Sequence, residues 1–158
     1  MAKWMDNETN WQRCRLRRER TNAAVKKLLS RKGKCLLLIV DDIEEVLVVF
    51  RLFLEKDGYE VHSAVNGVEA LRLAKTLRPD LILLNYMMPV MDGLTALTTL
   101  KGDPIISYLK VVMHSALSSS ASFRTAALEA GAIECLQIPF DRATLMKAVH
   151  KALRDDRR

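Results

Sequence analysis

Short strand-like stretches alternate with amphipathic stretches five times along this 158-residue chain. Two of them, residues 35–40 and 81–84, are continuous apolar runs, and the run at 81–84 is too short for a helix and fits a strand that is buried on both faces. Apolar residues at helical spacing follow each strand-like stretch, and glycine or proline ends most of these helices. The expected strands cover residues 35–40, 59–64, 81–84, 110–115 and 133–138. This alternation predicts an α/β fold with a doubly wound, five-stranded parallel sheet.

Positive charge is concentrated at the start of the chain. Residues 1–34 contain eleven Lys or Arg and three acids, whereas the rest contains fourteen Lys or Arg and sixteen acids. We therefore separate a basic extension, residues 1–33, from a nearly neutral domain, residues 34–158. Good helix formers at positions 23–29 predict a helix in the extension. Its basic side chains include Arg13, Arg15, Arg17, Arg18, Arg20, Lys26 and Lys27.

Two interpretations of this extension stay open. It is either a solvated tail, which a wrongly assigned start codon would also produce, or a docking helix. As a docking helix it would suit an acidic protein surface, nucleic acid or anionic lipid.

Cysteine and histidine usage indicates the cellular setting. Three widely spaced cysteines suggest no disulfide framework, and neither they nor the three histidines form a metal-ligand pattern. No apolar run approaches the roughly 20 residues that cross a bilayer, and the start lacks the apolar core of a secretion signal. We therefore expect a cytoplasmic protein without a membrane span. Because no nucleophile–base pair or cofactor loop occurs, we expect neither an enzyme nor a required cofactor.

Polar residues stand where several predicted strands end. Asp41 and Asp42 follow the first strand, Asn85 ends the third, and Ser115 ends the fourth. In open α/β sheets, ligands bind at the carboxyl ends of the strands, so these side chains are candidates for a shared site. Taken alone, the acidic pair could also serve as a helix cap.

The stretch DLILLNYMMPVMDG at 80–93 resembles the phosphorylation loop of bacterial response-regulator receiver domains. The acidic pair, S-A-L after the fourth strand and P-F-D after the fifth extend this resemblance over about residues 35–153. It implies a flavodoxin-like strand order, 2-1-3-4-5. It also implies that Asp41, Asp42 and the carbonyl of Met87 hold magnesium. Asn85 then stands at the phospho-acceptor aspartate, and Ser115 is the hydroxyl that binds the phosphoryl group.

Three positions depart from the family pattern. Asn85 replaces the acceptor aspartate, Ile138 replaces the lysine that neutralises phosphate, and Cys135 replaces an aromatic switch residue. An amide is a poor nucleophile, and an isoleucine supplies no cation to a phosphoryl group. Three departures within one mechanism favour a natural, degenerate receiver. We expect weak magnesium binding at most.

These features predict a phosphorylation-independent interaction module of two-component signalling. Its partner would be a signalling protein or a second copy in a homodimer. The expected partner face contains Phe123, Arg124, Arg142, Lys147 and Lys151. One alternative is a regulator that binds nucleic acid through the basic extension. Another is an ordinary phospho-receiver of a phosphorelay that carries an engineered Asn85, although Ile138 weighs against it.

Overall fold

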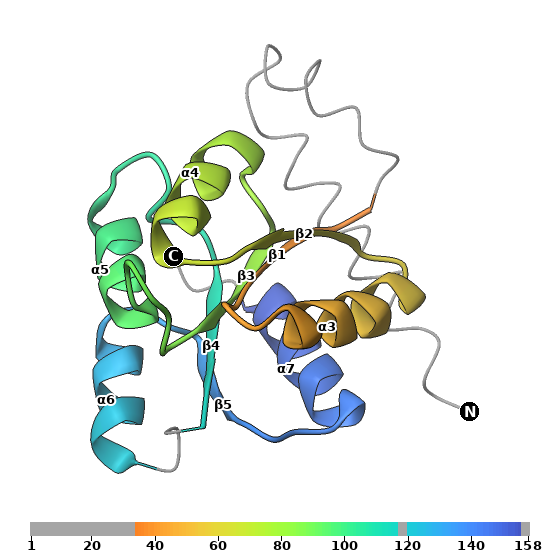
Figure 1. Cartoon of the computed structure of the whole chain (residues 1–158). Helices are drawn as coiled ribbons and strands as arrows, with labels where there is room; N and C mark the ends of the chain where they lie inside the picture. The colour runs from red at the N-terminus through yellow and green to blue at the C-terminus, as the bar shows by residue number, and fades with distance from the viewer. Residues whose placement is uncertain (1–33, 117–119, 156–158) are drawn as a thin grey trace.

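A single parallel sheet forms the centre of the molecule. The computed structural model describes residues 34–116 and 120–155, so the extension 1–33 and its predicted helix lie outside the described residues. The sheet has the strand order β2-β1-β3-β4-β5 (Figure 1). Its strands are β1 (Leu36–Val40), β2 (Glu60–Ala64), β3 (Leu81–Asn85), β4 (Val111–Ser115) and β5 (Glu134–Gln137). The predicted fold class and strand order are therefore confirmed.

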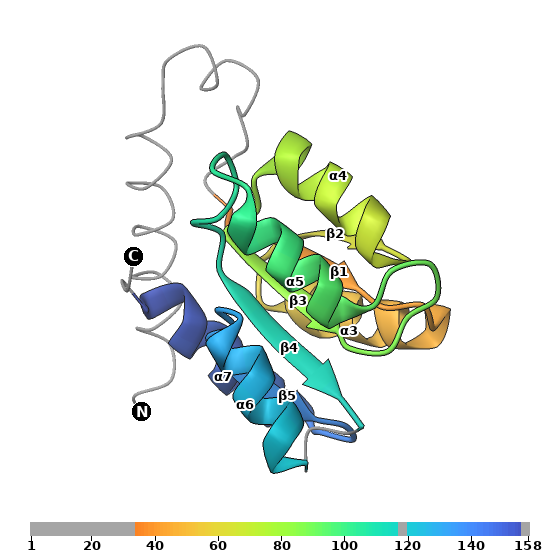
Figure 2. The same cartoon turned by 90° about the vertical axis from the view of Figure 1, so that its left-hand side faces the viewer.

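Helices cover both faces of the sheet. On one face lie α3 (Glu44–Lys56) and α7 (Arg142–Arg154), and on the other lie α4 (Gly67–Leu77), α5 (Gly93–Gly102) and α6 (Ala121–Glu129). Figures 1 and 2 show these two layers with the sheet between them. All residues of the three inner strands β1, β3 and β4 are buried. Burial on both faces accounts for the apolar sequence of β1 and for the apolar residues that precede Asn85 in β3 and His114 in β4.

Polar side chains fix where three of the helices begin. Asn66, Asp92 and Asp141 each accept a hydrogen bond from the main-chain N–H three residues further on, at 2.8–2.9 Å. These bonds satisfy N–H groups that have no partner within the first turn of a helix. The caps therefore set the starts of α4, α5 and α7.

The loop between β3 and α5 folds back onto the end of its own strand. The Gly93 N–H donates to the Tyr86 carbonyl at 2.7 Å. A Cβ atom placed on Gly93 would lie 2.0 Å from the Asn85 main-chain oxygen, which no side chain tolerates. The absence of a side chain at Gly93 therefore allows this loop to close against β3, beside the carboxyl end of the strand.

The structure corrects the expectation for the cysteines in one respect. Cys35 is buried and disulfide-bonded, and the described part of the chain does not contain its partner. Cys135 is a buried free thiol. Sequence spacing alone does not determine which cysteines pair, so the argument for a reducing compartment loses this support. No helix within residues 34–116 and 120–155 is long and apolar enough to span a bilayer.

Candidate functional site

The side-chain amide of Asn85 lies between two oxygens at the carboxyl end of the sheet. Its nitrogen donates to the Met87 carbonyl at 3.0 Å and makes a longer contact of 3.4 Å with the Asp42 carboxylate. Asn85 ends β3, Met87 follows in the next loop, and Asp42 follows β1, the neighbour of β3 in the sheet. The structure therefore brings together three residues that the sequence predicted to share a site.

Asp41 lies in the same site but is more deeply buried than Asp42. Its side chain is 2% exposed, and one carboxylate oxygen accepts a hydrogen bond from the Ile43 N–H at 2.9 Å. Burial raises the pKa of Asp41 to about 6, against the effect of the Ile43 hydrogen bond and with a further contribution from the Asp42 charge. This carboxyl therefore takes up a proton more readily than an exposed aspartate does.

His114 is a site neighbour that the sequence did not single out. His114 lies on β4, in register with Asn85 on the neighbouring strand β3. Its Nδ1 lies 3.7 Å from the Asp41 carboxylate. Burial lowers the pKa of His114 to about 3, so at neutral pH the ring is uncharged and this contact is not an ion pair. Neither ring nitrogen has a hydrogen-bond partner among the described residues. Its position directly before Ser115 was the sequence feature that could have placed it here.

The remaining predicted site residues lie at the ends of β4 and β5. Ser115 is 2% exposed, and its carbonyl accepts a hydrogen bond from the Ile138 N–H at 3.0 Å. Ile138 thus places an aliphatic side chain where the family resemblance implies a lysine. Cys135 lies deeper, paired in register with Met113 and only 4% exposed. Burial raises the pKa of its thiol. It therefore belongs to the core rather than to the polar site.

Magnesium fits this set of side chains poorly. The ion needs an octahedron of oxygen ligands and usually keeps several waters. Of the three groups that the resemblance assigns to it, the Asp42 carboxylate and the Met87 carbonyl are both contacted by the Asn85 amide nitrogen. No cluster of three His, Cys, Asp or Glu suited to a metal occurs within residues 34–116 and 120–155. The Asn85 N–H groups therefore compete with a cation for these oxygens.

The residues predicted to form one partner face have different surroundings in the structure. Phe123 is wrongly placed on it, because this ring is 8% exposed and packs against Tyr86 with centroids 4.4 Å apart. Arg124 and Lys151 both form ion pairs with Glu134 on β5, so they link α6, β5 and α7.

The other two predicted face residues differ from each other. Arg142 pairs with Asp57 at the end of α3 and therefore lies apart from the Glu134 cluster. Lys147 is exposed on α7. The basic residues of the extension, from Arg13 to Lys27, lie outside the described part of the chain.

Comparison with known proteins identifies the class that this fold and site define. The family model described as the response regulator receiver domain matches residues 37–150, and the chain belongs to this family. Receiver domains are signalling modules of two-component systems.

Two curated response regulators illustrate the similarity in sequence. The chain is 42% identical over 118 residues to the transcriptional regulatory protein PrrA of Mycobacterium tuberculosis, which covers 75% of this chain and 49% of PrrA. It is 39% identical over 118 residues to the response regulator PleD of Caulobacter vibrioides, which covers 75% of this chain and 26% of PleD. The chain thus spans half or less of the length of these two relatives.

A solved structure confirms the fold. A chain of the CheX–CheY–BeF3–Mg complex from Borrelia burgdorferi matches with a TM-score of 0.73 at 27% identity. The match covers 78% of this chain and 92% of that one.

Proposed function

We propose that this chain is a pseudo-receiver, a signalling interaction module that works without phosphorylation. The observation that carries the proposal is the hydrogen bond from the Asn85 amide nitrogen to the Met87 carbonyl, at 3.0 Å. It engages the residue at the phospho-acceptor position in an internal contact that a carboxylate cannot make, because a carboxylate has no proton to donate at neutral pH.

The chemistry of an amide supports this proposal. Phosphoryl transfer to a receiver requires a carboxylate oxygen that attacks phosphorus and forms an acyl phosphate. The nitrogen lone pair of Asn85 is delocalised into its carbonyl group, so the side chain is a poor nucleophile. The two carboxylates of the site, Asp41 and Asp42, follow β1 and do not stand at the end of β3.

The same amide can take over part of the role of a cation. A magnesium ion would attract the Asp42 carboxylate and the Met87 carbonyl, and the Asn85 N–H groups point partial positive charge at the same two oxygens. The site is therefore held together from within the chain. We infer that its loops keep one arrangement whether or not magnesium and a phosphoryl donor are present.

Two further residues favour the proposal independently of Asn85. Ile138 supplies no positive charge beside Ser115, so a phosphoryl group would lack its usual counter-charge there. Cys135 is small and packed into the core, so it cannot move an aromatic ring in and out of the structure. A single engineered substitution at Asn85 would account for neither residue.

The partner in this proposal is a signalling protein or a second copy of the chain. The ion pairs of Arg124 and Lys151 with Glu134 join α6, β5 and α7, and we place the docking face on these three elements. By analogy with its family, we place the protein in the cytoplasm and assign it no enzymatic activity. Nucleic-acid binding through the basic extension stays a prediction from charge alone.

The test is intact mass after incubation with acetyl phosphate and magnesium. We expect no gain of a phosphoryl group by the natural chain. The control is the double variant Asn85→Asp with Ile138→Lys, which restores the acceptor and the cation and should gain one. A hydroxylamine-labile phosphoryl adduct on the natural chain would contradict the proposal.

A second measurement tests the conformational part of the proposal. Amide NMR spectra recorded with and without magnesium and beryllofluoride should be the same for the natural chain, because its site is closed internally. The double variant should show shifts around β3, β4 and β5. Shifts of that size in the natural chain would show that its site still responds to a phosphoryl mimic.

A further inference from the structure

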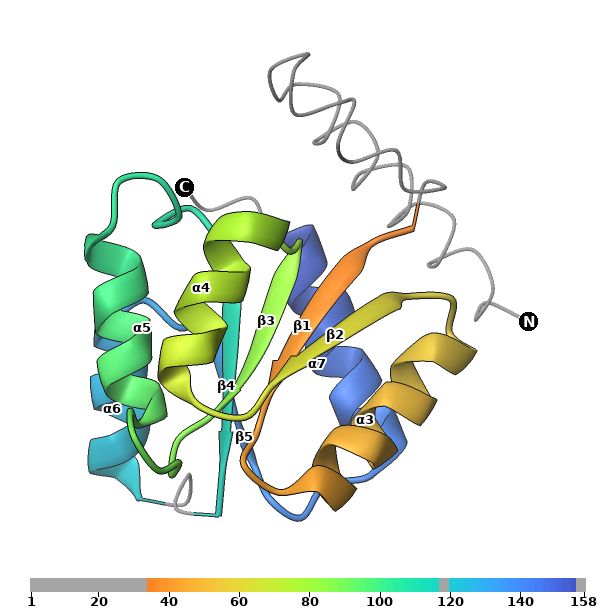
Figure 3. The same cartoon turned by 45° about the horizontal axis from the view of Figure 1, so that its top comes forward.

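Helix α3 carries an exposed apolar stripe opposite its buried face. Val48, Val49 and Leu52 are 49%, 42% and 61% exposed, and their spacing places them side by side on the helix. The residues of the same helix that are buried in the core are Leu47, Phe50 and Leu54. Figure 3 shows α3 and α7 on one side of the sheet and α4, α5 and α6 on the other. The stripe therefore faces away from the sheet, and a contiguous exposed apolar surface usually marks a contact site.

Two opposite charges stand at the ends of this stripe. At alternating intervals of four and three residues, its central line runs through Glu45, Val49, Leu52 and Lys56. Such an alternation aligns side chains along one seam of a helix. Glu45 in the first turn and Lys56 in the last are both exposed. Within residues 34–116 and 120–155, neither forms an ion pair. The apolar centre is thus bounded by one acid and one base.

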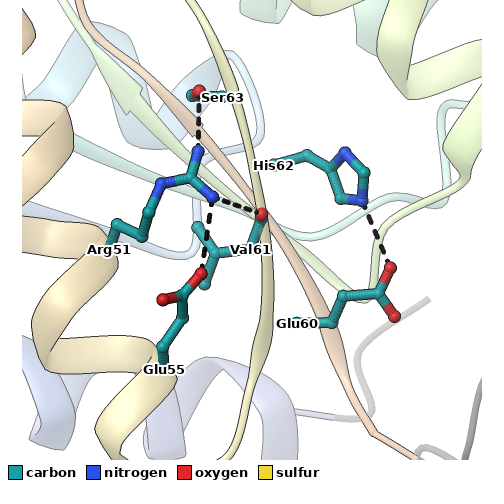
Figure 4. Close-up of polar contacts among 6 residues, drawn as sticks. All are labelled: Arg51, Glu55, Glu60, Val61, His62 and Ser63. Carbon is teal, nitrogen blue, oxygen red and sulfur yellow. Dashed lines mark hydrogen bonds and ion pairs between the residues drawn. The ribbon is translucent and has the colours of Figure 1, made fainter.

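The other charged side chains of α3 lie beside the stripe or turn away from it. Glu44 and Glu55 are exposed along one flank. Arg51 is turned toward β2, where it donates to the Val61 carbonyl at 2.9 Å and to the Ser63 hydroxyl at 3.0 Å (Figure 4). Arg51 also contacts Glu55 at 3.4 Å. Glu55 therefore has a basic partner within its own helix, and the central line of the stripe keeps equal numbers of positive and negative charges.

This arrangement is complementary to itself. When two copies of α3 lie antiparallel about a two-fold axis, Glu45 of each copy faces Lys56 of the other. In the same arrangement, Val49 of each copy faces Leu52 of the other. A parallel arrangement would instead place Glu45 against Glu45 and Lys56 against Lys56, and like charges repel. Charge therefore selects the antiparallel pairing.

We propose that a second copy of this chain docks on α3 and that the protein forms an antiparallel dimer through this helix. Glu45 and Lys56 form an ion pair at each end of the interface, and Val48, Val49 and Leu52 pack at its centre. Helix α3 has 13 residues and is about 20 Å long, so the interface is smaller than the roughly 800 Å² per partner that stable complexes bury. The dimer is therefore weak and reversible. It uses no residue of α6, β5 or α7 and does not depend on the pseudo-receiver proposal.

Sedimentation equilibrium of the full-length chain tests the dimer. For an interface of this size, we expect reversible association between about 0.01 and 1 mM. Leu52→Lys places a charge in the apolar centre twice, once from each copy, and should weaken association by about tenfold or more. Its matched control is Val68→Lys. Val68 is 50% exposed at the start of α4, on the other side of the sheet, and its substitution should leave association unchanged.

Two outcomes of this experiment would overturn the proposal. One is a natural chain that stays monomeric over the whole concentration range. The other is an equal effect of Leu52→Lys and Val68→Lys, which would place the contact on another surface. Circular dichroism and urea unfolding verify that both variants fold, and both substituted residues are exposed in the natural chain.

Exchanged charges test the antiparallel pairing. Glu45→Lys places a lysine against Lys56 of the other copy, and Lys56→Glu places an acid against Glu45 of the other copy. Each repulsion occurs twice in a two-fold dimer, so each variant alone should associate about tenfold more weakly than the natural chain. An equal mixture of the two variants should recover association, because every facing pair again joins an acid and a base.

Isotope labelling identifies which dimer forms in the mixture. With one variant labelled with ¹⁵N, native mass spectrometry should show mainly dimers that contain one chain of each kind. This recovery cannot arise from altered folding, since the mixture contains the same two chains that fail to associate alone. A mixture that does not recover would overturn the antiparallel pairing. Association that resists both charge changes, as a dimer joined by a disulfide would, also overturns docking on α3.

Discussion

The side-chain amide nitrogen of Asn85 donates to the main-chain oxygen of Met87 at 3.0 Å. This bond joins the end of β3 to the loop that follows it, and it lies beside the buried carboxyl group of Asp41 and the exposed one of Asp42. An amide donates there and adds no charge. In its contacts with Met87 and Asp42, Asn85 therefore acts as a neutral donor.

Asn85→Asp should destabilise the chain in the absence of magnesium. The variant loses the donor to Met87 and places a third negative charge beside Asp41 and Asp42, so we expect a loss of about 1–3 kcal/mol in the free energy of unfolding. Urea denaturation at neutral pH measures this loss. Added magnesium should restore part of it.

The control for this prediction is Asn66→Asp, which makes the same chemical change at a helix cap. Asn66 accepts a hydrogen bond from the Glu69 N–H, and an aspartate can accept it equally well. This variant should keep or slightly increase its stability. If Asn85→Asp proved as stable as the natural chain without magnesium, the donor role of Asn85 would be wrong.

Magnesium should bind weakly to the natural chain. Its expected ligands are engaged by Asn85, so calorimetry should detect little heat at millimolar magnesium, and Asn85→Asp should bind more tightly. Any residual binding should disappear in Asp42→Ala. Tight binding that survives this substitution would place the metal elsewhere.

Asp41 and His114 should contribute to the pH dependence of stability with opposite signs. The pKa of Asp41 is raised to about 6 in the folded state, whereas it is about 4 in the unfolded state. Between pH 6 and pH 4, the carboxyl group is therefore protonated mainly in the folded state. The contribution of Asp41 to the free energy of unfolding therefore becomes more favourable as the pH falls from 6 to 4. The pKa of His114 is lowered to about 3, so its contribution falls as the pH decreases from 6.5 to 3.

Separate substitutions reveal these two effects. Asp41→Asn should increase the free energy of unfolding above pH 6 by up to about 3 kcal/mol. The stability of this variant should still fall as the pH decreases from 6.5 to 3, because His114 is unchanged. His114→Phe removes a buried ring whose nitrogens lack partners among the described residues, and it keeps the aromatic contact with Phe50. This variant should be more stable than the natural chain by about 1–3 kcal/mol. Its stability should still rise as the pH falls toward 4, because Asp41 is unchanged. Urea unfolding across pH 3.5–8 measures both slopes, and identical profiles for the two variants would refute the assignment.

Gly93→Ala should disrupt the loop that closes against β3. The new methyl group would lie 2.0 Å from the Asn85 main-chain oxygen, and the backbone must move to relieve this clash. We expect a loss of about 3 kcal/mol in unfolding free energy. Gly102→Ala is the control, because a Cβ atom there meets nothing within 4 Å, and it should be neutral or slightly stabilising. Equal effects of the two substitutions would contradict the close approach at Gly93.

The sequence by itself determined the elements, the fold and the positions of the polar strand ends. Local patterns were sufficient for this, because apolar runs, helical spacing and caps such as Asp92 and Asp141 act within a few residues of the chain. The place of Asn85 at the end of β3 followed from the same patterns. The family resemblance then supplied the strand order.

Only the tertiary structure decided what each side chain at that edge contacts. Asp42 follows β1, whereas Asn85 and His114 lie on β3 and β4, so their distances depend on the register between strands that are far apart in sequence. Phe123, predicted to lie on the surface, is buried in the core, and Arg142 forms an ion pair with Asp57. Side-chain burial and direction arise from packing between layers, and the pKa values of Asp41 and His114 follow from that burial. No local sequence pattern contains this information, since the same residues at other depths would titrate normally.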